Sequence, residues 1–111
     1  MTAEYTLDAH STGLFCGYIE NGHILAMAGV DFTSDREWEL QAVSADPMYR
    51  NKGLTKAVCS FAVTYILENG RAAACETNRA NCAMRRVLIQ IGMKLYMPEN
   101  GFFLKEFAKP Y

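Results

Sequence analysis

Hydrophobic residues along the chain change their spacing from stretch to stretch, and turn signals separate the stretches. Apolar or alternating runs beside turn residues, as on either side of Asn21-Gly22, predict β-strands. Apolar residues that recur every three or four positions predict α-helices. Strands are predicted over residues 15–19, 23–32, 38–45, 72–76, 94–97 and 102–107, and helices after residues 53 and 78. The order β-β-β-α-β-α-β-β predicts a mixed α/β fold, with a mostly antiparallel sheet and one parallel crossover through the first helix.

The two predicted helices have apolar faces and recognisable ends. The apolar face of the first helix consists of Leu54, Val58, Phe61, Ala62, Tyr65 and Ile66. Asn69-Gly70 ends this helix. Asn78 is predicted to cap the second helix and Gly92 to close it. The core face of the second helix consists of Met84, Val87, Leu88 and Ile91. Between the predicted hairpin and the first helix, the apolar run over 38–45 predicts a strand that is buried on both faces.

Length and composition predict a single globular domain. A chain of 111 residues is long enough for one hydrophobic core and too short for two. No apolar run approaches the roughly 20 residues that span a bilayer. Residues 1–5 lack the basic and apolar regions of a signal peptide. We therefore expect a cytoplasmic protein without a membrane partner.

The four cysteines do not have the spacing of a metal site. Cys16, Cys59, Cys75 and Cys82 form no C-x-x-C pair, and each lies in a stretch that reads as strand or helix. Buried free thiols in a reducing compartment are therefore favoured over metal ligands or a disulfide framework.

Charge is distributed unevenly although the net charge is only −1. Residues 1–46 carry eight acidic residues and one basic residue, whereas residues 47–111 carry ten basic and four acidic residues. The balanced total argues against a nucleic-acid binder, which usually has a strongly basic face. The asymmetry favours a basic pocket for an anionic ligand beside an acidic wall. The alternative is that the charges are scattered over solvated surfaces.

The stretch around Gly53 is the best candidate for a binding site. A predicted strand ends at Asp46-Pro47, and a short basic turn leads to Gly53, where the first helix begins. Such a turn directs backbone N–H groups and the helix dipole at one point, which suits a phosphate group. Positive charge at the same corner comes from Arg50, Lys52 and Lys56. A phosphorylated ligand is therefore predicted.

Three features in this order resemble the GNAT superfamily, the Gcn5-related N-acetyltransferases. Arg50-x-x-Gly53-x-Thr55 resembles the pyrophosphate motif of that family, and Asp46-Pro47-Met48-Tyr49 precedes it. Asn81, followed by Gly92-Met93, is similar to the asparagine helix of the family, which ends in Gly-Phe. The resemblance covers residues 15–107 and makes residues 15–111 a GNAT-like acetyltransferase domain, with residues 1–14 as an N-terminal segment. Two departures are Thr55 at a small-residue position and Leu88, where many members carry a tyrosine that protonates the leaving thiolate.

The resemblance implies that the chain binds acetyl-CoA or coenzyme A in a splayed cofactor cleft. The strands over 38–45 and 72–76 would separate, and pantetheine would lie between them. Val43 and Ala45 would offer main-chain contacts to the acyl group and pantetheine. The pyrophosphate would lie on the backbone of Arg50, Asn51, Lys52, Gly53, Leu54 and Thr55. Asn81 would face the pantetheine arm or the acceptor; the alternative is that Asn81 only satisfies backbone groups at a helix start.

Glu39 is the candidate catalytic residue. It lies eleven residues before Arg50, at the position of a strand glutamate that acts as general base in some GNAT members. Partial burial would raise the pKa of this carboxylate and suit it to take a proton near neutral pH. The alternative is a solvated edge residue. Cys75 and Cys82 have no histidine close in sequence and are disfavoured as acyl carriers, and His10 and His23 are expected at the surface or in turns.

These features favour an acyl-CoA-dependent N-acyltransferase that acetylates a primary amine of a small molecule or protein. The alternative is a GNAT-like module that binds CoA or a partner without catalysis. A domain that binds another nucleotide is a third reading, weakened because no Walker lysine follows Gly53. GNAT members usually have a first strand and two helices that wall the acceptor site, for which residues 1–14 look too short. Either the chain is a fragment or another subunit supplies this wall, and a homodimer is the simplest assembly.

Overall fold

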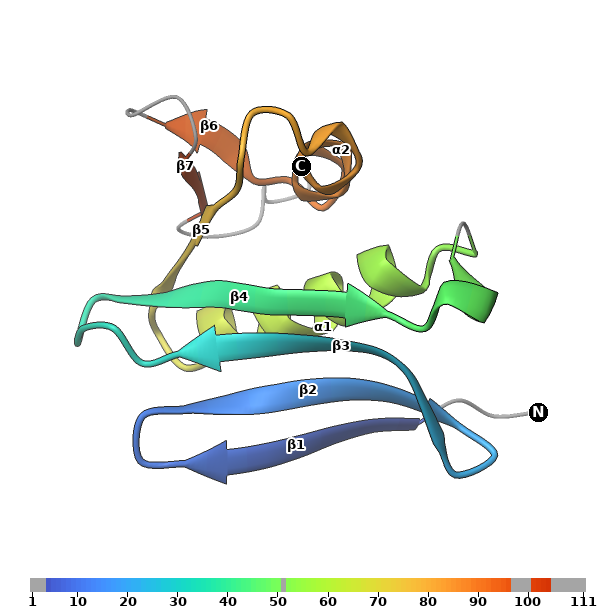
Figure 1. Cartoon of the computed structure of the whole chain (residues 1–111). Helices are drawn as coiled ribbons and strands as arrows, with labels where there is room; N and C mark the ends of the chain where they lie inside the picture. Colours follow the sequence, from blue (N-terminus) through green and yellow to red (C-terminus); the bar gives the residue numbers. More distant parts are fainter. Residues whose placement is uncertain (1–3, 51, 97–100, 105–111) are drawn as a thin grey trace, which may run out of the picture.

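The computed structural model describes residues 4–50, 52–96 and 101–104, which form one sheet with two α-helices (Figure 1). The elements, in chain order, are β1 (Glu4–His10), β2 (Gly13–Glu20), β3 (His23–Asp31), β4 (Glu37–Ala45), the one-turn 3-10 helix η1 (Pro47–Tyr49), α1 (Leu54–Glu68), β5 (Ala72–Glu76), α2 (Cys82–Gln90), β6 (Lys94–Tyr96) and β7 (Gly101–Leu104). The ends of two predicted strands, at Met97 and over residues 105–107, lie outside the described residues.

The sheet has the strand order β1-β2-β3-β4-β5-β7-β6. Every neighbouring pair is antiparallel except β4 and β5, which run parallel on either side of the α1 crossover. A mixed, mostly antiparallel sheet with one parallel crossover was predicted and is confirmed. The hairpin between β2 and β3 turns through Asn21 and Gly22, which both have positive φ angles, as a tight hairpin turn requires.

The first strand was not predicted. β1 pairs with β2 along its whole length, from Glu4 opposite Ile19 to His10 opposite Gly13. No strand was predicted before residue 15, so the start of the predicted order is wrong, and the observed order begins with four strands instead of three. The sequence does hold a signal, because residues 4–10 alternate between polar and apolar types with the period of a strand.

The core lies between the sheet and α1, which crosses the same face of β2, β3, β4 and β5 (Figure 1). Its fully buried side chains from the helix are Val58, Cys59, Ala62, Val63 and Ile66. The sheet contributes alternate residues such as Cys16, Ala28, Val30 and Leu40, since successive strand residues point to opposite faces. The predicted helix face is therefore confirmed, with Cys59 and Val63 added to it.

Burial of β4 on both faces was predicted and is wrong. Only Trp38 and Leu40 of this strand are buried, and its second half is half-buried or exposed. The reason is that α1 packs on one face of β4 only, so Glu37 and Glu39 point to the other face. The pairing with β5 is also short and extends only from Glu37 opposite Ala72 to Glu39 opposite Ala74. Beyond Glu39, β4 no longer pairs with β5, and the two strands diverge (Figure 1).

The start of α2 also differs from the prediction. Asn81, not Asn78, caps this helix, because its side chain accepts a hydrogen bond from the Met84 backbone N–H at 3.1 Å. The Asn78 side chain instead accepts from the Ala80 backbone N–H at 2.8 Å, in the turn before the helix. Of the predicted core face, Leu88 is fully buried and the others pack half-buried against the core: Met84, Val87 and Ile91.

Three of the four cysteines are buried, as predicted, whereas Cys82 is exposed at the start of α2. Burial raises the pKa of Cys16 to about 11 and the pKa values of Cys59 and Cys75 to about 12. These three groups are therefore neutral thiols near pH 7. His10 and His23 are both exposed, as expected. Within the described ranges, neither helix has the length and apolarity needed to cross a bilayer.

Candidate functional site

The end of β4 is shaped by a β-bulge. Met27 of β3 lies opposite Ser44, but Gly29 lies opposite Gln41, so Ala42 and Val43 together face the single residue Ala28. Ala42 has a positive φ angle of 52°, which a residue with a side chain rarely adopts. A bulge bends its strand and leaves one residue out of the ladder. The bulge lies in the part of β4 that has already separated from β5.

The turn after β4 presents the start of α1 without a side-chain cap. Asp46 accepts a hydrogen bond from the Met48 backbone N–H at 2.9 Å and so begins η1. Gly53 then adopts the left-handed conformation, with φ of 77°, and makes no side-chain cap bond because it has no side chain. The first bond along the helix runs from the Ala57 N–H to the Gly53 carbonyl at 3.0 Å.

The N–H groups of residues 54–56 therefore have no acceptor within α1. No acidic residue occupies the first turn to compensate them. Together with the positive end of the helix dipole, these groups favour an anion at this position.

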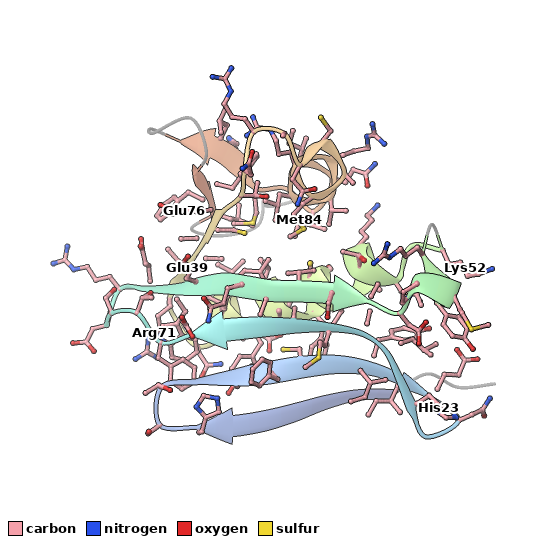
Figure 2. The ribbon with its side chains drawn as sticks, in the orientation of Figure 1. His23, Glu39, Lys52, Arg71, Glu76 and Met84 are labelled. Atoms are coloured by element: carbon pink, nitrogen blue, oxygen red, sulfur yellow. The ribbon has the colours of Figure 1, made fainter. Side chains whose placement is uncertain are left out.

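A cleft of about 490 Å³ opens between this turn, the end of β4 and α2. Its lining residues are Val43, Ser44, Ala45, Tyr49, Arg50, Gly53, Leu54, Thr55, Lys56, Asn81, Ala83, Met84, Arg86, Val87 and Gln90. Figure 2 shows Met84 on the side of α2 that faces β4. The cleft thus occupies the space that the separation of β4 from β5 leaves open.

Most of the residues predicted to bind a cofactor meet in this cleft. The lining includes Val43, Ala45, Arg50, Gly53, Leu54, Thr55 and Asn81. Lys52 is exposed and is not among the lining residues, and Asn51 lies outside the described residues. Sequence reasoning missed the wall that α2 supplies. If the helix is taken to begin at Asn81, its period places Ala83, Val87 and Gln90 on one face. This spacing is the sequence signal that could have predicted the α2 wall.

The cleft is basic. Arg50, Lys56 and Arg86 are among its lining residues, and none of the lining residues in the described part of the chain is a carboxylate. Other lining side chains are apolar, among them Leu54, Met84 and Val87. An elongated ligand with anionic groups and a less polar arm fits this composition.

Asn81 caps α2, which is one of the two roles that the sequence left open, and its contact with the pantetheine arm or the acceptor stays a prediction. Its side-chain oxygen accepts the capping bond from the Met84 N–H, and the residue also lines the cleft. Because an amide side chain has an acceptor oxygen and a donor NH₂ group, the cap uses only the oxygen. The NH₂ group keeps its capacity to donate to a ligand.

Glu39 does not line the cleft, and it lies four residues before Val43, the first residue of β4 that does. Its neighbours in sequence, Trp38 and Leu40, are buried in the core, so Glu39 points to the sheet face opposite α1. It pairs with Asp31 on β3 and with Ala74 on β5, at the last position before β4 and β5 separate. Figure 2 shows Glu39 and Glu76 near this point.

Burial raises the pKa of Glu39 above its ordinary value, and the negative charges of Glu76, Asp31 and Glu37 raise this pKa further. This carboxylate therefore holds a proton more readily than a solvated glutamate does. Leu88, by contrast, is fully buried in the core and is absent from the lining, so this position contributes nothing to the cleft.

The sequence profile of the acetyltransferase (GNAT) family matches residues 2–93, which is most of the chain. This protein belongs to the GNAT acetyltransferase family. No curated protein matches the chain. The resemblance inferred from the motifs is therefore confirmed, and the motif residues Arg50, Gly53, Thr55 and Asn81 all line one cleft.

Solved GNAT structures have the same fold at low sequence identity. The ribosomal-protein-S18-alanine N-acetyltransferase from Escherichia coli is 20% identical, with a TM-score of 0.70 over 86% of this chain and 68% of its own. A GNAT acetyltransferase from Elizabethkingia anophelis with acetyl-CoA bound is 9% identical, with a TM-score of 0.71 over 83% of this chain and 73% of its own. The PaiA N-acetyltransferase from Thermoplasma acidophilum, in complex with coenzyme A, is 17% identical, with a TM-score of 0.69 over 83% of this chain and 58% of its own.

The cleft of this GNAT member suits the cofactor that the family uses. Coenzyme A is an elongated molecule with a pyrophosphate, a further phosphate and a pantetheine arm. The lining supplies three cations, uncapped helix N–H groups and apolar side chains, and no carboxylate to repel the phosphates. The residues present therefore fit coenzyme A in charge and in polarity.

Proposed function

We propose that this chain is an acyl-CoA-dependent N-acyltransferase that transfers the acetyl group of acetyl-CoA to a primary amine of a small molecule or protein. The observation that carries the proposal is the basic cleft in which the uncapped start of α1 meets Arg50, Lys56 and Arg86. Membership of the GNAT family supports the same reaction class.

Each part of the cleft has a task in this proposal. The backbone of residues 50–55 holds the pyrophosphate through N–H groups and the helix dipole. Val43 and Ala45, on the part of β4 that no longer pairs with β5, offer backbone groups to the pantetheine amides. Asn81 donates its free NH₂ group to the pantetheine arm or the acceptor. When bound, acetyl-CoA supplies an activated thioester.

Glu39 is the proposed general base. The acceptor amine must lose a proton to become nucleophilic, and its nitrogen then bonds to the acetyl carbon as the C–S bond to CoA breaks. Glu39 takes the amine proton, and its raised pKa places it closer to neutral pH, where a base works best. Because Leu88 is buried, the leaving thiolate takes its proton from water or another group.

A non-catalytic CoA-binding or interaction module is the second candidate. The burial of Leu88 favours it, because the position where many GNAT members carry an acid does not reach the cleft. Both candidates predict binding of CoA, whereas only the first predicts turnover.

One pair of measurements tests both candidates. Calorimetry should show binding of acetyl-CoA and not of ATP, and a thiol assay should show CoA release in the presence of a mixed library of primary amines. Binding without CoA release would leave the second candidate. Absence of binding to either acetyl-CoA or CoA would reject both.

A further inference from the structure

The basic residues of the cleft lie on two different walls. Arg50 and Lys56 flank Gly53, so both belong to the wall that carries the uncapped start of α1. Arg86 belongs to α2, which forms the opposite wall of the cleft. Two cationic walls around one cleft suit a ligand that has two separate anionic groups.

Arg86 has no partner within the described part of the chain. No hydrogen bond, ion pair or ring contact engages its side chain there, and the residue is exposed at the cleft. Its neighbour Arg85 differs in both respects, because Arg85 is half-buried and its guanidinium lies 5.3 Å from the centre of the Phe102 ring. Of these two adjacent arginines, only Arg86 lines the cleft, with Gln90 one helical turn further along the same wall.

Coenzyme A carries two anionic groups of this kind. Its pyrophosphate links the pantetheine arm to the nucleotide, and a separate phosphate is attached to the 3′ position of the ribose. The α1 wall already offers backbone N–H groups, Arg50 and Lys56 to the pyrophosphate. A guanidinium group binds a terminal phosphate with two parallel hydrogen bonds, a geometry that suits the 3′-phosphate better than a bridging pyrophosphate.

We propose that Arg86 binds the 3′-phosphate of coenzyme A and makes the cleft selective for CoA over 3′-dephospho-CoA. This inference rests on the proposed function, since it concerns the same cleft. It adds a recognition residue from α2 to a site whose other anion-binding groups all lie at the start of α1.

Calorimetry with CoA and 3′-dephospho-CoA tests the assignment on three proteins: the parent, Arg86→Gln and Arg85→Gln. Hydrogen bonds to a charged group change affinity by roughly 10- to 100-fold, and an exposed site belongs at the lower end. The parent should therefore bind CoA about tenfold more tightly than dephospho-CoA. Arg86→Gln should lose that preference by weakening CoA alone, whereas Arg85→Gln, which removes the same charge one residue away, should keep it.

Each other outcome has a definite meaning. Equal loss of affinity for both ligands in Arg86→Gln would place Arg86 on the pyrophosphate and overturn the proposal. Equal binding of both ligands by the parent would overturn it too, while the proposed CoA site would stand. If the parent bound neither ligand, the proposed function itself would fail. Arg86→Lys keeps the charge but cannot form the two parallel hydrogen bonds, so its preference for CoA over 3′-dephospho-CoA should lie between those of the parent and Arg86→Gln. Thermal melting confirms that each variant is folded.

Discussion

At the scale of single residues, Glu39 has the environment with the clearest consequences. Three other carboxylates surround it on one face of the sheet: Glu37 on the same strand, Asp31 on β3 and Glu76 on β5. Partial burial and this negative charge both disfavour its ionised form. The raised pKa of Glu39 should therefore affect both the stability of the fold and the proposed catalysis, and each effect can be measured separately.

Glu39→Gln should make the folded protein more stable at pH 7. Because folding raises the pKa of Glu39, the folded state binds its proton more tightly than the unfolded state, and the penalty is present only where Glu39 is ionised. The gain should disappear as the pH falls below about 4, where the carboxyl group is protonated in both states. Urea unfolding of both proteins at pH 7 and near pH 4 measures this difference in the free energy of unfolding. A variant less stable than the parent at pH 7 would show that Glu39 makes stabilising contacts instead.

If Glu39 is the general base, Glu39→Gln should lower kcat by about 10²- to 10⁴-fold. The affinity for acetyl-CoA should not change, because the cleft lining does not include Glu39. The loss should shrink as the pH rises, since more of the amine is then already neutral. Initial rates across pH 6–9 with saturating amine measure this dependence.

Glu37→Gln is the matched control for the catalytic test. Glu37 lies two residues away on the same face of β4 and raises the pKa of Glu39. Its removal should move the acidic limb of the rate profile to lower pH without the large loss in kcat. Parent-like rates for Glu39→Gln across this pH range would make Glu39 a surface residue and leave the CoA site intact.

At the scale of elements, the start of α1 depends on the conformation of one glycine. Gly53 has a φ angle of 77°, and a Cβ atom added there would meet no atom within 4 Å. Its importance is therefore conformational and not steric, since a β-branched residue at positive φ is strained. Gly70, at the other end of α1, has a φ angle of 76° and equally open surroundings.

Gly53→Val should weaken acetyl-CoA binding by about tenfold or more, because relief of the strain turns the first N–H groups of α1 away from the phosphate. Gly70→Val imposes the same strain at a position that does not line the cleft, so it should lower the melting temperature by a similar amount without affecting binding. Calorimetry and thermal melting of both variants provide the comparison. Equal acetyl-CoA affinity in Gly53→Val and the parent would show that the anion site lies elsewhere.

At the scale of the whole molecule, the described helices cover only one face of the sheet. α1 covers one face of β2, β3 and β4, and neither described helix packs on the other face. Phe15 lies on that other face, opposite Gly29, and 38% of its surface is exposed. Exposed apolar sheet surface is commonly covered by association, which keeps a homodimer as our proposal for the assembly.

Light scattering at micromolar concentration should give twice the 12.4 kDa mass of the chain. Phe15→Ser should shift the protein toward the monomer. Ile89→Ser, which removes an exposed apolar side chain from α2, should leave the dimer intact. A parent protein that stays monomeric at this concentration would contradict the proposal.

The sequence alone determined the features that depend on neighbouring residues. The positive φ angles at Asn21-Gly22 and Gly53, and the apolar period of α1, follow from local steric and helical preferences. The bounds of five elements were therefore predicted closely: β2, β3, β4, α1 and β5. Membership of the GNAT family and most of the α1 wall of the cleft followed from the same local motifs. β1 also had a local signal, an alternating pattern, which the prediction missed. The Asn81 cap was predicted only as the alternative to a role for Asn81 toward the pantetheine arm or the acceptor.

Only the tertiary structure decided which distant segments meet. The separation of β4 from β5 depends on where their pairing stops, and the acidic surroundings of Glu39 depend on the register that places Asp31 beside it and Glu76 nearby. Arg85 and Arg86 are adjacent and chemically identical, yet one lies over Phe102 and the other lines the cleft. Their difference is set by how α2 packs against α1 and β6, and such packing depends on contacts between residues that are far apart along the chain.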